Sequence, residues 1–406
     1  MMCSKKKIIF VTEKLIMGGV EKSLLELIKI LSPYMEITVA VMQRGGELEL
    51  EICKYADVKL LLNDKLNFKQ IFIDKIRRSK IVDAFHMIRS VCKSVKEKSY
   101  IRQCTSRIYE IDKINEYYDF AVCYHKPTDI LVPFTALRIN AKNKIIWFHT
   151  EILETVRMDE EYYKRIYELY DSFVCVSESV HLQLNDFLKN RKSNIYTIYN
   201  YIDEYALYSK SKAFSSSFRH NQINIVTVGR LSKEKGQDIA IKAAQILKDK
   251  SINFTWYLIG DGPYYAELFQ LRKKLSLENH IRFLGYKENP YPYIKDCDIY
   301  VQPSREEGYG LSVAEAKLFQ RPVIVTNFLT ATEHIDNGKN GYIVSMDEKE
   351  LSLKIIYLIE NPKERKKIMK VLKNYEYSSQ CEKRIFNLFG IKMEEEYYDK
   401  CNYSSI

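Results

Sequence analysis

Short apolar runs alternate with segments of helical periodicity along almost the whole chain. Between the first two runs, leucine and isoleucine recur at the three- and four-residue spacing of one helix face. Apolar runs that alternate with helices predict right-handed βαβ units around a parallel sheet. In the first half of the chain the runs are Ile8–Thr12, Ile37–Met42, Val58–Leu62, Phe120–Tyr124, Ile145–Phe148 and Phe173–Val176.

A second series of apolar runs fills the other half of the chain. Residues 201–222, between the two series, are polar and have no period, which is typical of an interdomain linker. The pattern therefore predicts an α/β protein with two Rossmann-like, doubly wound domains, over residues 1–200 and 223–374. The runs of the second series are Ile223–Val228, Phe254–Ile259, Ile281–Leu284, Ile299–Gln302, Val323–Thr326 and Tyr342–Val344.

Composition narrows the class of protein and its compartment. The 406 residues are 46% apolar and 29% charged, with 9 prolines and 14 glycines, which indicates a well-cored globular protein. The 9 cysteines are scattered and include no Cys-x-x-Cys pair, which predicts a reduced, cytoplasmic protein without a structural zinc site. No apolar stretch approaches the roughly 20 residues that a membrane-spanning helix needs.

The net charge of +10 is concentrated in one segment. Residues Lys65–Arg102 hold 11 basic and 3 acidic residues, which leaves the other 368 residues with a net charge of only +2. An apolar stripe at helical spacing runs through this segment, formed by Ile81, Phe85, Ile88, Cys92 and Val95. Basic residues lie close to this stripe in the sequence, namely Lys80, Arg89, Lys93, Lys96 and Lys98.

This basic segment has two interpretations that the sequence leaves open. The stripe is explained by packing against the core, with the basic residues on a solvated face. A basic amphipathic helix also binds anionic lipid, at about 1 kcal/mol per basic residue. Nucleic acid is disfavoured as a partner because no recognised binding motif accompanies the charge.

The segment that follows the run Ile299–Gln302 has the features of an anion site. Gly308 and Gly310 stand two apart before the pattern becomes helical, so backbone N–H groups at a helix N-terminus lie at the carboxyl end of a strand. Glu307 lies on the loop and Glu315 about two helical turns further on. Two carboxylates beside a phosphate site suggest recognition of sugar hydroxyls, although both could also be ordinary surface acids.

A second loop of similar chemistry follows the run Ile223–Val228. It reads Gly229-Arg230-Leu231-Ser232-Lys233-Glu234-Lys235-Gly236. The guanidinium of Arg230 can form a fork onto phosphate oxygens, and Lys235 can supply a second positive charge. A diphosphate with a sugar attached would satisfy both loops, whereas the duller interpretation is a solvated basic loop.

Two other motifs are given structural interpretations. Gly260-Asp261-Gly262 is half of a dinucleotide fingerprint, but Pro263 follows and the third glycine is missing, which argues against a nicotinamide site. Ser177-Glu178-Ser179 is interpreted as a helix cap, because no Gly-x-Ser-x-Gly elbow surrounds it.

Taken together and in this order, the motifs resemble the retaining glycosyltransferases of family four, which have the GT-B fold. The resemblance extends over nearly the whole chain. Besides the two loops, it rests on Gly18-Gly19-Val20-Glu21, Val176-Ser177-Glu178-Ser179, Tyr199-Asn200, Ile259-Gly260-Asp261-Gly262-Pro263, Phe283-Leu284-Gly285-Tyr286 and Asn337-Gly338-Lys339-Asn340-Gly341.

The resemblance implies two domains that face each other across a deep cleft, with the acceptor on the N-terminal domain and the nucleotide sugar on the C-terminal one. It also implies that residues 375–406 pack back on the N-terminal domain, with contacts from Phe386, Leu388 and Phe389. One departure is Gln320, at a helix end where many relatives place a glycine or another small residue.

Roles for individual residues follow from the same resemblance. Arg230 and Lys235, with Gly229 beside them, hold the donor diphosphate; Glu307 contacts the transferred sugar and Glu315 the ribose. The remaining expected contacts are from the backbone amides of Tyr309, Gly310 and Leu311 to phosphate, from His149 to the sugar, and from Gly18 and Gly19 to the phosphate or acceptor.

The implied activity is transfer of a sugar, with retained anomeric configuration, from a nucleotide-diphosphate donor, expected to be a UDP-sugar. The expected acceptor is a lipid-linked oligosaccharide of cell-surface polysaccharide biosynthesis, at the inner face of the plasma membrane. No metal or other cofactor is expected, because no Asp-x-Asp metal site is evident and two cations and a helix end face the diphosphate. The alternatives are a GT-B sugar-nucleotide epimerase or hydrolase, and a catalytically silent carbohydrate-binding relative.

Overall fold

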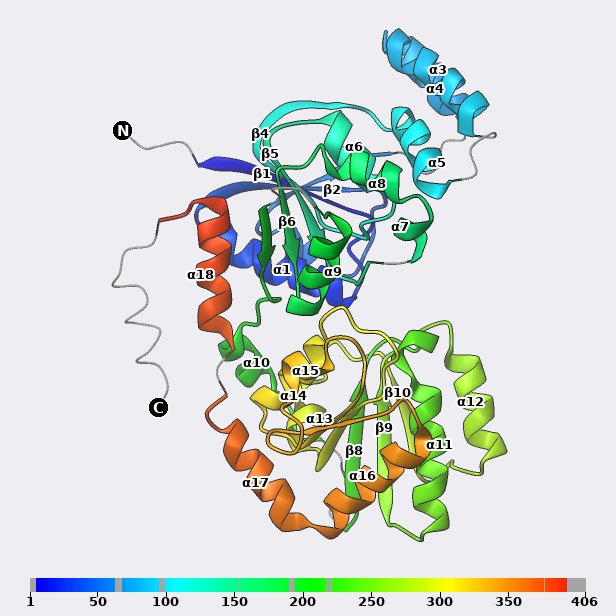
Figure 1. The fold of residues 1–406 in the computed structure, drawn as a ribbon, viewed down its shortest axis with the longest axis vertical. Helices are drawn as coiled ribbons and strands as arrows, with labels where there is room; N and C mark the ends of the chain where they lie inside the picture. The colour runs from blue at the N-terminus through cyan, green and yellow to red at the C-terminus, as the bar shows by residue number, and fades with distance from the viewer. Residues whose placement is uncertain are drawn as a thin grey trace. The chain divides into compact units, whose positions relative to one another are not determined.

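The chain forms two compact units of α/β structure (Figure 1). The computed structural model describes residues 5–62, 68–94, 99–152, 154–189, 194–216, 218, 221–375 and 377–392. The described residues of Met1–Val176, Val180–Tyr201 and Ser379–Ile406 make up the first unit. Those of Ser177–Ser179 and Ile202–Ser378 make up the second.

A parallel sheet of seven strands, in the order β3-β2-β1-β4-β5-β6-β7, organises the first unit. The apolar runs are buried because helices cover both faces of such a sheet. Its strands are β1 Lys6–Thr12, β2 Met35–Val41, β3 Asp57–Leu60, β4 Ile114–Cys123, β5 Ile139–Phe148, β6 Ser172–Cys175 and β7 Asn194–Thr197. Its helices are α1 Gly19–Leu31, α2 Glu49–Ile52, α3 Phe68–Arg77, α4 Ile81–Ser94, α5 Tyr100–Arg107, the short 3-10 helix η1 Ile108–Glu110, α6 Leu131–Arg138, α7 Glu154–Met158, α8 Glu160–Tyr167, α9 Glu178–Phe187 and α18 Ser378–Phe389.

The second unit has a six-stranded parallel sheet in the order β10-β9-β8-β11-β12-β13. Along the chain, β9 pairs with one side of β8 and β10 pairs with β9, whereas β11 pairs with the other side of β8. The strand order therefore reverses between β8 and β11, where doubly wound sheets bind ligands. The strands are β8 Ile223–Val228, β9 Phe254–Ile259, β10 Ile281–Gly285, β11 Ile299–Gln302, β12 Val323–Thr326 and β13 Tyr342–Val344. The helices are α10 Glu204–Lys210, the short 3-10 helix η2 Lys233–Lys235, α11 Gln237–Asp249, α12 Tyr265–Lys274, α13 Tyr291–Asp296, α14 Leu311–Leu318, α15 Ala331–His334, α16 Glu348–Glu360 and α17 Pro362–Leu372.

The segment that was expected to be a linker, residues 201–222, differs in the structure. It contains helix α10, whose N-cap Asp203 accepts a hydrogen bond from the Ala206 N–H at 2.9 Å. The Tyr208 hydroxyl donates to the Leu318 carbonyl at 2.7 Å. From Ile202 onward this segment belongs to the second unit. The helix was not predicted because its 7 residues bury only Leu207 and therefore show no apolar periodicity.

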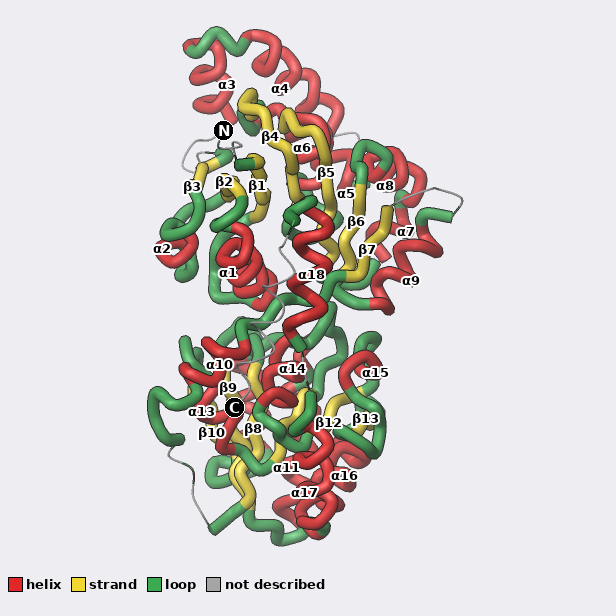
Figure 2. The backbone as a smooth tube through the Cα atoms, turned by 90° about the vertical axis from the view of Figure 1, so that its left-hand side faces the viewer, coloured by secondary structure: helices red, strands yellow, loops and turns green. Residues whose placement is uncertain are grey.

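The last described helix, α18, belongs to the first unit (Figures 1 and 2). The ring of Phe386 lies 5.4 Å from that of Tyr34, and the ring of Phe389 lies 5.2 Å from that of Phe120. The guanidinium of Arg384 donates to the carbonyl of Thr197 at 2.8 Å. The chain thus returns to the unit from which it started.

Helix α4 corrects one interpretation of the basic segment. Ile81, Phe85 and Ile88 are each at least half exposed, so packing against the core does not explain this part of the apolar stripe. Instead α4 buries Ala84 and Met87 on its other side. The side chains of Cys92 and Lys93, and the residues Lys65, Val95, Lys96 and Lys98, lie outside the described residues. Among the helices described, none has the length and apolar character required to cross a membrane.

Candidate functional site

Two loops of the second unit leave the carboxyl ends of neighbouring strands. β8 leads into Gly229 and Arg230, and β11 leads into the loop from Ser304 to Gly310. Because β8 and β11 pair in parallel, both loops lie at the same edge of the sheet. The structure therefore brings together the two segments in which the sequence analysis placed the donor site.

The first loop approaches the second so closely that a side chain would not fit at Gly236. This residue has φ +65°, and a Cβ there would lie 1.9 Å from the Pro303 carbonyl oxygen. Arg305 of the second loop also holds the helix that follows the first loop, because its guanidinium binds both oxygens of Asp238 in α11, at 2.8 and 2.7 Å. Burial alone would raise the pKa of Asp238, but its hydrogen bonds to Arg305 lower it.

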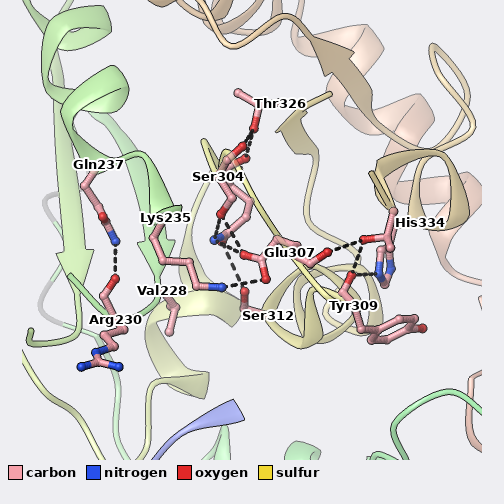
Figure 3. Close-up of polar contacts among 12 residues, drawn as sticks. Val228, Arg230, Lys235, Gln237, Ser304, Glu307, Tyr309, Ser312, Thr326 and His334 are labelled. Atoms are coloured by element: carbon pink, nitrogen blue, oxygen red, sulfur yellow. Dashed lines mark hydrogen bonds and ion pairs between the residues drawn. The ribbon is translucent and has the colours of Figure 1, made fainter. Parts of the chain in front are cut away.

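Glu307 forms the centre of this site (Figure 3). Its Oε2 lies 2.7 Å from Nζ of Lys235, and its Oε1 accepts hydrogen bonds from Ser304 Oγ at 2.8 Å and Gln302 Nε2 at 3.1 Å. The side chain is only 7% exposed. A buried carboxylate with three donors is held in one orientation, and its ion pair with Lys235 compensates its charge.

The loop that carries Glu307 is also held through its backbone. The Tyr309 carbonyl accepts hydrogen bonds from Thr330 Oγ1 at 3.0 Å and from His334 Nε2 at 2.7 Å. Burial, together with the nearby charge of Lys317, lowers the pKa of His334 to about 3, so the imidazole is neutral and Nε2 carries the proton. Sequence reasoning missed Thr330 and His334 because they act on a backbone carbonyl, which no residue pattern reveals.

Helix α14 begins directly after this loop. Its N-cap is Gly310, in a left-handed conformation with φ +101°, which supplies no side-chain cap. Such a helix end offers N–H groups and a partial positive charge to an anion. Further along the helix, Glu315 Oε1 accepts a hydrogen bond from the Tyr291 hydroxyl at 3.3 Å.

Arg230 is not part of the Glu307 network. Its side chain is exposed, and Figure 3 shows the guanidinium directed away from Glu307. The Arg230 carbonyl accepts a hydrogen bond from Gln237 Nε2 at 2.8 Å, which anchors the backbone of the loop. Lys235 is thus engaged with a carboxylate, whereas Arg230 presents its charge to solvent.

His149 belongs to the first unit, at the carboxyl end of β5. It is 7% exposed, and neither ring nitrogen has a hydrogen-bond partner among the described residues. Burial, with a contribution from the charge of His125, lowers the pKa of His149 to about 3, so the ring is neutral. Thr12 Oγ1 and Thr150 Oγ1 at this edge are also buried without a partner in the described part of the chain. Buried polar atoms of this kind are typical of a site that a ligand completes.

A histidine that the sequence analysis did not select lies at the same edge. His125 Nδ1 is 2.5 Å from Oδ2 of Asp129, and its Nε2 is 3.3 Å from Oε2 of Glu13. Burial alone would lower the pKa of His125, but the hydrogen bond and charge of Asp129 raise it overall. The four-residue spacing of His125 and Asp129 was the only signal in the sequence.

The two glycines before α1 differ in their surroundings. A Cβ at Gly18 would lie 2.2 Å from Oε2 of Glu21, whereas a Cβ at Gly19 would meet no atom within 4 Å. The carboxylate of Glu21 therefore lies against the Gly18 backbone at the N-terminus of α1. A Cβ at Gly18 would displace the flexible end of the Glu21 side chain, and Gly19 leaves open space beside the loop.

The fold is that of the GT-B class. The solved structure of the Anabaena protein HepE in complex with UDP and glucose is 20% identical to this chain, and the alignment covers 98% of this chain and 100% of that one with a TM-score of 0.68. This likeness confirms the predicted fold class of two doubly wound domains.

The sequence comparisons agree with this fold. Residues 208–375 match the family model of the glycosyl transferases group 1. An uncharacterized glycosyltransferase of Methanocaldococcus jannaschii is 33% identical over 201 residues, 48% of this chain and 52% of that protein. The O-antigen biosynthesis glycosyltransferase WclY of Escherichia coli is 31% identical over 154 residues, 37% of this chain and 42% of that protein.

These alignments span about half the length of the relatives or less. The matched segment contains every predicted donor-site residue of the second unit, from Gly229 to Glu315. The resemblance to GT-B glycosyltransferases of envelope polysaccharides is confirmed by these comparisons, whereas the narrower assignment to family four stays a prediction.

Proposed function

We propose that this protein is a glycosyltransferase that moves a sugar from a nucleoside diphosphate to an acceptor hydroxyl, with retained anomeric configuration. The observation that carries the proposal is the ion pair between partly exposed Lys235 and the buried carboxylate of Glu307, at the point where the strand order of the second sheet reverses. The family match over residues 208–375 supports it, because it covers this whole site.

The donor is bound by the two loops of the second unit. Arg230, the ammonium of Lys235 and the N–H groups of Tyr309, Gly310 and Leu311 receive the diphosphate. Glu307 accepts hydrogen bonds from the sugar and Glu315 from the ribose. Lys235 is shared between Glu307 and phosphate, so donor binding links the position of the sugar to that of the leaving group. The UDP bound to HepE supports a UDP-sugar as the donor.

Transfer builds negative charge on the diphosphate and positive, oxocarbenium-like charge on the sugar. Arg230, Lys235 and the N-terminus of α14 stabilise the first, and the buried carboxylate of Glu307 stabilises the second. The leaving phosphate accepts the proton of the attacking hydroxyl. In the first unit, His149 is neutral and buried, and its ring nitrogens, which have no partner among the described residues, are available to a bound ligand.

The acceptor is a lipid-linked oligosaccharide of cell-surface polysaccharide assembly. The similarity to WclY, whose name places it in O-antigen biosynthesis, supports this part of the proposal. The competing functions are a sugar-nucleotide epimerase or hydrolase, which needs no acceptor, and a silent carbohydrate-binding protein.

The experiment measures release of free nucleoside diphosphate from a panel of UDP- and GDP-sugars, with and without bacterial membranes as the source of acceptor. We expect acceptor-stimulated release from one donor. A matched pair of variants tests the site, because Glu307→Gln removes the buried charge whereas Glu306→Gln changes an exposed carboxylate on the same loop. Glu307→Gln should lower kcat/KM by about a hundredfold or more, and Glu306→Gln should leave it within a few-fold.

Three results would contradict the proposal. Release that is equally fast without membranes indicates hydrolysis or epimerisation. No release from any donor indicates the silent relative. Equal kcat/KM for the two glutamine variants shows that the Lys235–Glu307 pair is not the site of chemistry.

A further inference from the structure

A buried lysine that the proposed mechanism does not use lies on α14, two residues after Glu315. Lys317 is 2% exposed. Burial lowers the pKa of its ammonium from 10.5 to about 8, and no carboxylate of the described residues counteracts this shift. Since an ammonium is costly to bury without a countercharge, its other contacts are informative.

The ammonium of Lys317 is held between a carbonyl and an aromatic ring. It donates to the carbonyl of His334, the last residue of α15, at 2.5 Å. It also lies 3.9 Å from the centre of the Tyr375 ring, within the range of a cation–π contact. The His334 carbonyl accepts a longer hydrogen bond from Asn340 Nδ2, at 3.4 Å. Lys317 is therefore the closer of these two donors that fix the end of α15.

The residue that Lys317 holds also supports the start of α14. We call residues 309–311 the phosphate loop, because their N–H groups are the proposed phosphate contacts. His334 Nε2 donates to the Tyr309 carbonyl at 2.7 Å (Figure 3), and a Cβ at Gly310 would lie 3.5 Å from the same nitrogen. The rings of Tyr309 and His334 are 4.4 Å apart. Contacts thus run from Lys317 through His334 to the phosphate loop.

We propose that Lys317 is a positioning residue of the donor site. Its ammonium fixes the backbone of His334, the imidazole of His334 fixes the Tyr309 carbonyl, and the N–H groups of the phosphate loop are thereby directed at the diphosphate. The charge also lies within about 10 Å of the N-terminus of α14, where it adds to the positive potential at the anion. The inference deepens the proposed function and rests on it for the identity of the ligand, a nucleoside diphosphate.

The titratable groups around Lys317 do not share its expected change of charge near pH 8. His334 is neutral there, because burial and the charge of Lys317 lower its pKa to about 3. Tyr375 faces the ammonium with its ring. β12 has no titratable side chain. The titratable groups of α13 and β11 engage other partners, and they are Tyr291, Tyr293, Lys295, Asp296 and Tyr300.

The first test needs no ligand. Amide hydrogen exchange of the phosphate loop is compared in the wild type, Lys317→Met and Lys354→Met. Lys354 is a matched control because its ammonium also lies over a tyrosine ring, 4.2 Å from the centre of Tyr342, but belongs to α16. We expect about tenfold faster exchange of the loop in Lys317→Met and no change in Lys354→Met. Equal exchange of the loop in all three proteins overturns the proposal.

The second test is the pH dependence of UDP affinity, measured by isothermal titration between about pH 7.5 and 9.5, where the terminal phosphate, with a pKa near 6, is already ionised. Wild-type affinity should fall by about fivefold as Lys317 loses its proton. Lys317→Met should bind UDP about tenfold more weakly at pH 7.5 and lack this fall, whereas Lys354→Met should resemble the wild type. The same fall in Lys317→Met overturns the proposal.

A pair of variants at Tyr375 tests whether the titrating group is Lys317. Tyr375→Phe keeps the ring face, and Tyr375→Leu removes it. Because the ring stabilises the charged ammonium, the fall in UDP affinity should move to lower pH by about 0.5 unit in Tyr375→Leu and stay in place in Tyr375→Phe. Equal midpoints in the two variants contradict the assignment to Lys317.

A purely structural role for Lys317 predicts a different pH dependence. The pKa of Lys317 is about 8 in the folded unit and 10.5 without burial, so between these values the unfolded state binds more protons. The contribution of this group to stability therefore rises with pH while UDP affinity falls. A wild type that binds no UDP refutes the proposed function, whereas hydrogen exchange of the phosphate loop still decides whether Lys317 positions it.

Discussion

Carboxylates at this site differ in what holds them, and this difference predicts what each substitution does. Glu307 is fixed by two hydrogen-bond donors and an ion pair, whereas Glu315 accepts a hydrogen bond from Tyr291 at 3.3 Å. The first arrangement suits a group that must stay in place while charge develops, and the second a group that binds a ligand in the ground state.

For Glu315 we therefore expect an effect on affinity. If Glu315 accepts hydrogen bonds from the ribose as proposed, Glu315→Ala should weaken UDP binding by roughly tenfold or more, since hydrogen bonds to a charged group contribute about 1.5–3 kcal/mol. Isothermal titration with UDP measures this directly. The control Tyr291→Phe leaves the carboxylate in place and should change the UDP affinity much less. Unchanged UDP affinity in Glu315→Ala would contradict the proposed contact between Glu315 and the ribose.

His334 predicts a pH dependence of stability. Its pKa in the folded unit is lowered to about 3 by burial and by Lys317, so it stays neutral while an unfolded histidine takes up a proton below about 6.5. The unfolded state then binds more protons, and stability falls as the pH drops from about 6.5 toward 3. The slope from this one group approaches 1.4 kcal/mol per pH unit.

The comparison of His334→Gln with the wild type isolates this effect. Glutamine can still donate to the Tyr309 carbonyl but does not titrate, so between pH 6.5 and 5 the variant should lose about 1–2 kcal/mol less stability than the wild type. Since the chain has 2 tryptophans, one in each unit, urea unfolding in a Trp147→Phe background follows the second unit through Trp256. Equal losses of stability in His334→Gln and the wild type would contradict the assignment. An equally reduced loss of stability in the control His280→Gln would contradict it as well.

At the scale of elements, the end of α14 is where sequence and local geometry disagree. Gln320 lies just after this helix with φ +57°, the left-handed region that glycine occupies without cost. The departure from the small residue of many relatives therefore falls at a position where the backbone is strained. The helix ends there nonetheless, because the Gln320 N–H donates to the Lys317 carbonyl at 2.8 Å.

Gln320→Gly should stabilise the second unit. Relief of the left-handed conformation gains about 1–2 kcal/mol, and the greater freedom of glycine in the unfolded chain offsets about 0.4–1 kcal/mol of this. We expect a net gain of roughly 0.5–1 kcal/mol in urea unfolding followed through Trp256. Gln320→Ala keeps the backbone strain and should gain little; an equal gain in both variants would point to the side chain instead.

The elements that sequence predicted well are those with long buried runs. All six apolar runs of the second half are strands, and β8 and β9 have the predicted bounds Ile223–Val228 and Phe254–Ile259. β7 at Asn194–Thr197 was missed because an edge strand with alternating exposure forms no apolar run. The surroundings of the apolar stripe of α4 were left open for a related reason, since periodicity shows that a stripe exists but not what covers it.

At the scale of the whole molecule, each unit carries its candidate groups at the carboxyl edge of a parallel sheet. This could be predicted for Glu307, Arg230 and His149, because loops after apolar strands are visible in the sequence. The polar support of these groups could not be predicted, because it joins segments far apart in the chain. Gln302, Thr330 and His334 have meaning only once the fold brings them beside one loop.

The same arrangement predicts that turnover does not require a divalent metal. The diphosphate of the donor needs compensating charge, and the second unit offers Arg230, Lys235 and the N-terminus of α14 at one sheet edge. Because Lys235 also neutralises Glu307, the guanidinium of Arg230 has to supply much of this charge. We therefore expect full turnover in EDTA, and a loss of about a hundredfold in kcat/KM for Arg230→Ala. If EDTA abolished activity and magnesium restored it, these groups would not suffice to compensate the charge of the diphosphate. Normal turnover of Arg230→Ala in EDTA would show that the compensating charge comes from other groups.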